Sequence, residues 1–146
     1  MKLMFLDIDG VLNNRESIGK GVHLLPEKSL LIDEICEKTD AYIIISSSWR
    51  YSHSQETLQT MLWISGMDRN KILGSTPRSE DGRRGREIKE CLDDFASEHH
   101  IESFVIIDDE ISDMLPEQKK HIVHTSMKDG ITREGVDWAI KILGGK

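Results

Sequence analysis

Short runs of apolar residues alternate along this chain with segments in which apolar residues recur every three or four positions. A continuous short apolar run is typical of a strand buried in a parallel sheet, and the three-to-four spacing is typical of an amphipathic helix. The runs predict strands at 3–6, 41–45, 71–73, 104–107 and 121–125. The spacing predicts helices at 26–38, 54–64, 86–98 and 132–143, with polar loops at 13–21 and 74–85.

Strands that alternate with helices predict an α/β fold. We therefore expect a Rossmann-like three-layer sandwich, in which a five-stranded parallel sheet lies between two layers of helices. A length of 146 residues suits one domain of ordinary size, so we expect a single domain that spans residues 1–146.

Composition narrows the class of protein further. Hydrophobic residues make up 38% and charged residues 31% of the chain, which favours a globular protein over a disordered one. No run approaches the roughly 20 apolar residues of a membrane span, and Asp7 interrupts the first apolar run too early for a signal peptide. Cys36 and Cys91 lie in predicted helices without metal-ligand spacing. We therefore expect a cytoplasmic protein with reduced thiols, no membrane association and no obligate protein partner.

Polar side chains follow the predicted strands at the point where three of them end. Parallel strands joined by right-handed crossovers bring their carboxyl ends to one edge of the sheet, where α/β proteins bind their ligands. This edge should collect two carboxylates after the first strand, two hydroxyls after the second and two carboxylates after the fourth: Asp7, Asp9, Ser46, Ser47, Asp108 and Asp109.

The first acidic pair indicates a metal site. Asp7 and Asp9 are two residues apart, so an extended backbone would point both carboxylates the same way, and Gly10 permits the sharp turn that follows. Two carboxylates this close repel each other unless a cation holds them. Mg²⁺ commonly binds one or two carboxylates together with substrate phosphate oxygens. The alternative is a solvated turn after a strand.

The serines after the second strand are candidates for phosphate binding, because hydroxyls and backbone N–H groups at a strand-to-helix turn can hold a phosphate. Ser46 is the first choice and Ser47 the second, since a shift of the strand end by one residue would exchange their positions. The alternative is a solvated loop or a helix cap.

The apolar strand followed by Asp7-Ile8-Asp9-Gly10-Val11-Leu12 resembles the first motif of the haloacid dehalogenase-like (HAD) phosphohydrolases. The resemblance implies that Asp7 is the nucleophile and Asp9 the acid/base, and that Asp108 and Asp109 complete a Mg²⁺ site with Asp7 and the Asp9 carbonyl. It also implies a phosphate-neutralising Lys or Arg in the third helix. Arg86, which opens the predicted helix, is the first choice for this cation, and Lys89 is the alternate.

The resemblance extends over nearly the whole chain. It is carried in order by the segments 9–13 (DGVLN), 46–50 (SSSWR), 75–77 (STP), 86–88 (REI), 107–109 (IDD) and 129–132 (DGIT). These look like the small HAD-type domain of Swiss Army Knife RNA repair proteins, with Ile131 in a position where Leu is expected. The intervals between the motifs leave no room for a large cap domain.

The sequence therefore predicts a Mg²⁺-dependent phosphohydrolase that acts through an aspartyl-phosphate. A net charge of −7 argues against a protein that coats nucleic acid, but cations concentrate in the stretch from Arg78 to Lys89. With the resemblance, this stretch favours phosphorylated oligonucleotide ends as the substrate. Trp49 and Trp63 are interpreted as core residues, with base stacking as the alternative.

Other functions compete with this interpretation. One is a phosphatase for small molecules such as nucleotides or sugar phosphates, and another is a catalytically idle phosphate-binding module of the same fold. A receiver-type signalling module would carry its phospho-accepting Asp after the third strand. Here that strand is followed by Gly74 and Ser75, which argues against the receiver.

Overall fold

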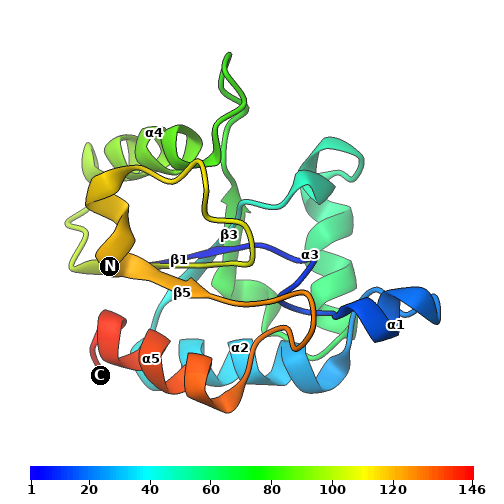
Figure 1. The fold of residues 1–146 in the computed structure, drawn as a ribbon. Helices are drawn as coiled ribbons and strands as arrows, with labels where there is room; N and C mark the ends of the chain where they lie inside the picture. The colour runs from blue at the N-terminus through cyan, green and yellow to red at the C-terminus, as the bar shows by residue number, and fades with distance from the viewer.

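A central parallel sheet organises the computed structural model, which describes all 146 residues (Figure 1). The five strands lie in the order β3-β2-β1-β4-β5, and all neighbours run parallel. Their bounds are β1 Lys2–Leu6, β2 Tyr42–Ile45, β3 Ile72–Ser75, β4 Ser103–Asp108 and β5 Ile122–His124. The predicted α/β fold with a five-stranded parallel sheet is confirmed.

Helices cover both faces of the sheet (Figure 1). The α-helices are α1 Arg15–Gly19, α2 Pro26–Thr39, α3 Gln55–Ile64, α4 Arg84–Ala96 and α5 Arg133–Leu143. Three short 3₁₀ helices are η1 Ser48–Tyr51, η2 Arg69–Lys71 and η3 Pro116–His121. The buried residues of α2, α3 and α5 join one hydrophobic cluster, and those of α4 join a second cluster on the opposite face.

The alternation of side chains along β1 divides the core between the two faces. Met4 and Leu6 belong to the cluster under α2, α3 and α5, whereas Leu3 and Phe5 belong to the cluster under α4. All four side chains are fully buried. A central strand with both faces covered has no solvent-facing position, which explains why its sequence is continuously apolar.

Two segments differ from the sequence prediction. The stretch 13–21, predicted as a loop, contains the short helix α1, which begins after Asn14. The Asn14 side chain accepts a hydrogen bond from the Ser17 backbone N–H and caps this helix. A five-residue helix with few apolar side chains carries no hydrophobic period, so the pattern could not reveal it. Helix α4 begins at Arg84, two residues earlier than predicted.

The register of the sheet places the ends of the central strands side by side. Leu6 pairs with Ile45 on β2 and with Ile107 on β4. The polar residues that follow each strand therefore meet at one edge, as predicted. No large cap covers this edge, although the loop between β3 and α4 projects from the molecule (Figure 1). None of the helices is long and apolar enough to span a membrane.

The two cysteines are buried and form no disulfide. Burial raises the pKa of the Cys36 thiol to about 12 and that of the Cys91 thiol to about 11. Both thiols are therefore protonated at neutral pH and poor nucleophiles.

Candidate active site

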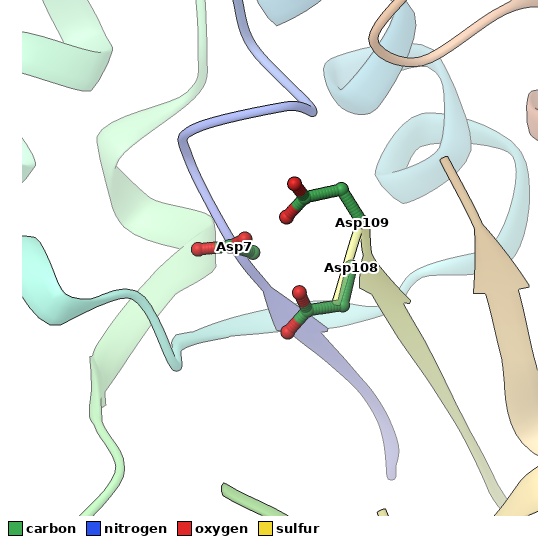
Figure 2. Close-up of side chains that lie close together, drawn as sticks. All are labelled: Asp7, Asp108 and Asp109. Atoms are coloured by element: carbon green, nitrogen blue, oxygen red, sulfur yellow. The ribbon is translucent and has the colours of Figure 1, made fainter. Parts of the chain in front are cut away.

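A cluster of carboxylates lies where β1 and β4 end. Asp108 and Asp109 point from the end of β4 toward Asp7, which follows β1 (Figure 2). One oxygen from each of the three side chains lies within 4.8 Å of the others. Asp7 is 5% exposed and Asp108 is fully buried, whereas Asp109 is half-buried. The register of the strands thus produces the acidic cluster that the sequence predicted.

Gly10 allows the loop after β1 to lie against this cluster. Its φ of +80° belongs to the left-handed region that side chains disfavour. A Cβ at this position would also lie 2.6 Å from the Asp109 Cγ atom. The loop is held there by Thr125, whose hydroxyl donates to the Gly10 carbonyl at 2.6 Å. Any larger residue at position 10 would displace either the loop or the Asp109 carboxylate.

The cluster is electrostatically unfavourable without a cation. Burial, together with the neighbouring Asp108, raises the pKa of Asp7 from 3.8 to about 9, and Arg84 opposes this shift only in part. Burial also raises the pKa of Asp108, again against the effect of Arg84. Closely spaced, poorly hydrated carboxylates either share a proton or bind a cation. Oxygen donors with this charge suit a hard divalent ion such as Mg²⁺.

The cation within the cluster is Arg84. Its Nη1 atom donates to the Asp108 Oδ2 atom at 2.7 Å and lies 3.5 Å from the Asp7 Oδ2 atom. The two predicted cations lie elsewhere. Arg86 is exposed and pairs with Asp81, while Lys89 is exposed and pairs with a carboxylate one helical turn away. The assignment of Arg86 or Lys89 to this position is therefore corrected to Arg84.

Helical periodicity could have identified Arg84. Residues four apart share one face of a helix. Arg84 stands four positions before the core residue Ile88, and Glu87 stands four before the core residue Cys91. Arg86 lies roughly opposite this buried face. The predicted start at Arg86 is wrong because it omits the first two residues of α4, and one of these is the site cation Arg84.

The first turn of α4 is fixed by the segment that follows the acidic cluster. The Asp113 Oδ2 atom accepts the Arg84 backbone N–H at 3.2 Å, and the Asp113 carbonyl accepts the Gly85 N–H at 3.3 Å. The Gln118 side-chain amide donates to the Gly85 carbonyl at 2.8 Å. A Cβ at Gly85 would lie 2.7 Å from the Asp113 carbonyl oxygen. A glycine is therefore required for α4 to pack closely enough to insert Arg84.

The two candidate phosphate-binding serines are both buried beside the cluster. Ser46 follows β2, and its backbone N–H donates to the Leu6 carbonyl. The Ser46 hydroxyl has no hydrogen-bond partner, whereas the Ser47 hydroxyl accepts the Trp49 N–H at 3.2 Å and caps η1. Ser46 therefore keeps a free hydroxyl, and Ser47 has a structural role. Neither residue lines the cavity above the cluster, which Ser48 does.

Asp9 lies apart from the carboxylate cluster and is half-buried. Its Oδ1 atom accepts a hydrogen bond from Asn13 at 2.9 Å, and its Oδ2 atom accepts one from the Trp49 indole at 3.1 Å. Trp49 packs partly against the core, as predicted, but its N–H also donates to Asp9, a contact that no local pattern in the sequence indicates. Trp63 is 53% exposed, so the prediction that it is a core residue is wrong.

An open cavity of about 340 Å³ is lined by Asp9 and by residues of the carboxylate cluster. Its lining includes Asp7, Asp9 and Asp109, the single cation Arg84, and three further acidic residues, Glu87, Glu110 and Asp113. Tyr51 from η1 lines the cavity and is 47% exposed. A cavity with this excess of negative charge can hold a phosphate only if additional positive charge enters with it.

Comparison with known proteins is consistent with this geometry. No curated protein and no solved structure is similar enough to the chain to give a match. One family model matches residues 3–136, a range that includes all the carboxylates of the cluster, Asp9, Ser46 and Arg84. The chain belongs to the family described as the HAD domain in Swiss Army Knife RNA repair proteins.

Proposed function

We propose that this protein is a Mg²⁺-dependent phosphohydrolase that works through an aspartyl-phosphate on Asp7. The proposal rests on one observation above all: Asp7 lies beside Asp108, Asp109 and Arg84 in the lining of an open cavity, and Asp9 lines the same cavity. Membership of a HAD family supports a hydrolase of the phosphatase type.

The reaction would proceed in two steps. An Asp7 oxygen attacks phosphorus, a P–O bond forms, and the bond to the leaving oxygen breaks. Asp9 gives its proton to that leaving oxygen. In the second step a water molecule attacks the phosphorus of the aspartyl-phosphate, Asp9 takes a proton from the water, and Asp7 is released.

Charge compensation would come from three sources. The Arg84 guanidinium, now 2.7 Å from Asp108, is close enough to Asp7 to contact a phosphoryl oxygen bound there. The Ser46 hydroxyl does not line the cavity, but it is buried without a partner where β2 ends and would donate to a phosphoryl oxygen that reaches it. Mg²⁺, held by Asp7, Asp108, Asp109 and the Asp9 carbonyl, would supply the remaining positive charge on the phosphoryl group.

The first experiment measures phosphate release from a panel that contains an aryl phosphate, nucleotides and 3′- or 5′-phosphorylated oligonucleotides, with Mg²⁺ or with EDTA. Wild-type protein should be active only with the metal. Asp7→Asn should abolish turnover, while the exposed Asp93→Asn, a matched control, should keep it. Asp7→Asn protein with wild-type activity would refute the proposal.

Binding of Mg²⁺ can be tested without activity. A ligand present at 100 times its dissociation constant stabilises the folded state by about 2.7 kcal/mol. Mg²⁺ should therefore raise the Tm of the wild-type protein by several degrees. Asp109→Asn should lose most of this shift, because it removes a ligand from the cluster. An equal Mg²⁺-induced shift in both proteins would show that the ion binds elsewhere.

We further propose that the substrate is the phosphorylated end of an oligonucleotide. No large cap closes the cavity, so a phosphate attached to a long chain could enter. Arg78 lies over the ring of Tyr51, which lines the cavity, with its Cζ atom 4.5 Å from the ring centroid. Arg78 and Arg83 are exposed and form no ion pair, whereas Arg86 and Lys89 are neutralised by aspartates. The free cations could contact the phosphates next to the terminal one.

The test compares kcat/KM for a phosphorylated oligonucleotide and a mononucleotide over a range of salt concentrations. Arg78→Ala with Arg83→Ala should raise KM for the oligonucleotide and flatten its salt dependence, because fewer counterions are released on binding. Arg86→Ala, whose charge is already paired, is the control. Equal kcat/KM values for the two substrates, unchanged by the double substitution, would instead favour a small-molecule phosphatase.

A further inference from the structure

We propose that Trp49 and Asn13 are positioning residues that hold the Asp9 carboxylate ready for proton transfer. The inference rests on the proposed phosphohydrolase function and assigns roles to two residues that the family match does not. The Trp49 Nε1 atom lies 3.1 Å from the Asp9 Oδ2 atom, and the Asn13 Nδ2 atom lies 2.9 Å from the Asp9 Oδ1 atom. Each carboxylate oxygen thus has its own fixed donor.

The orientation of the Asn13 amide is determined by the backbone around it. Its Oδ1 atom accepts the Gly10 N–H at 2.8 Å, and its Nδ2 atom donates to the His23 carbonyl at 2.9 Å. In the reversed orientation the amide NH₂ would face the Gly10 N–H, and the amide oxygen would face the His23 carbonyl. Neither pair can form a hydrogen bond, so only the observed orientation is possible. Asn13 is fully buried, which leaves it no alternative partner in solvent. It must therefore donate to Asp9.

Trp49 is held equally firmly. It lies in η1, whose first turn is capped by the Ser47 hydroxyl. The next residue, Arg50, donates from Nη1 to the Ser46 and Ser47 carbonyls, both at 2.8 Å. These bonds hold η1 against the end of β2. The indole stacks on the His53 ring, with centroids 5.5 Å apart. An indole confined on these sides keeps its N–H aimed at Asp9.

This arrangement fixes the Asp9 carboxylate without occupying all of its acceptor positions. A carboxylate has about four acceptor positions, and the two donors occupy one on each oxygen. A position on either oxygen therefore stays free to face the leaving oxygen of a bound phosphate ester. The two hydrogen bonds hold the Asp9 carboxyl group in position at the cavity, so its side chain does not have to change rotamer before it donates. The benefit should be largest when the leaving oxygen is basic and most needs the proton.

The test uses Trp49→Phe, which keeps the ring and removes only the indole N–H. The parameter is kcat/KM, because it reports the steps up to loss of the leaving group and not hydrolysis of the aspartyl-phosphate. We expect kcat/KM to fall roughly tenfold for an alkyl phosphate, the effect of one hydrogen bond to a charged group. The fall should be several times smaller for a nitrophenyl phosphate, whose leaving oxygen needs little proton assistance.

A double-mutant comparison separates positioning from general damage. In an Asp9→Asn background, Trp49→Phe should cause little further loss, because the group that it positions is already gone. Trp138→Phe, which changes an exposed tryptophan on α5, is the control and should match wild type on both substrates. Equal losses on the two phosphate esters, or a full additional loss in the Asp9→Asn background, would overturn the positioning role. A wild-type protein inactive on every phosphate ester would overturn the phosphohydrolase proposal itself.

Discussion

Removal of one partner from the buried ion pair between Arg50 and Glu87 should strongly destabilise the protein. The Arg50 Nη2 atom lies 2.7 Å from the Glu87 Oε1 atom, and the two side chains are 5% and 2% exposed. The other Arg50 donors contact the Ser46, Ser47 and Thr76 carbonyls and the Tyr51 hydroxyl, so all five N–H groups are used. The pair joins the end of β2 to helix α4, which carries Arg84.

We expect Glu87→Ala to destabilise the protein by about 3–5 kcal/mol, because it leaves the Arg50 charge buried without its carboxylate. It also removes the acceptor for the Ser79 N–H, now 2.9 Å from the Glu87 Oε2 atom. For a chain of this length each kcal/mol corresponds to roughly 2–4 °C in Tm, so Tm should fall by about 10 °C.

An apolar replacement of both partners gives a sharper test. A simple buried ion pair can often be replaced by packed apolar side chains at little cost. Arg50→Met with Glu87→Leu would instead leave the carbonyls of Ser46 and Thr76 without a donor, whereas the Ser47 carbonyl keeps the backbone N–H of residue 50. Each buried unsatisfied acceptor costs about 1–3 kcal/mol, so the double variant should stay at least about 2 kcal/mol less stable than wild type.

Both magnitudes can be measured by urea unfolding followed by circular dichroism. The control is Lys89→Ala, which breaks the exposed Lys89–Asp93 pair and should change stability by less than about 0.5 kcal/mol. A loss below about 1 kcal/mol for Glu87→Ala would contradict the reasoning, and so would wild-type stability in the double variant.

Further predictions concern the glycines and the charge of the cluster. Gly85→Ala should lower both Tm and kcat, since its Cβ would lie 2.7 Å from the Asp113 carbonyl oxygen and displace the Arg84 turn; circular dichroism melts and phosphate release measure this. Gly10→Ala should weaken the Mg²⁺-induced rise in Tm, because its Cβ would collide with Asp109. The pKa of Asp7 is about 9 in the folded state and 3.8 in the unfolded state. Between these pH values the folded state binds one proton more than the unfolded state, so the free energy of unfolding measured in EDTA should fall as pH rises. Asp7→Asn should flatten that fall between pH 5 and pH 8; an equally steep profile would contradict the assigned cause.

The sequence by itself determined the architecture and the acidic part of the site. Apolar runs that end in Asp7, Ser46 and Asp108 are local signals, and the geometry of parallel strands brings their ends together. The motif resemblance likewise depends only on the order of residues, and the family match confirms it. The roles of Asp7 and Asp9 remain predictions, since proximity to the cavity does not establish a reaction.

Only the tertiary structure decided which side chains form ion pairs and hydrogen bonds with these carboxylates. Arg84 reaches the cluster because Gly85 lets α4 pack against Asp113, a contact between segments 28 residues apart (113 − 85) that no local pattern encodes. Trp49 donates to Asp9 across 40 positions of sequence, although its apolar surface gives it the pattern of a core residue. Hydrophobic periodicity records which face of an element is buried. Hydrogen bonds and ion pairs depend on the direction of individual atoms, and these directions are set only when the elements pack.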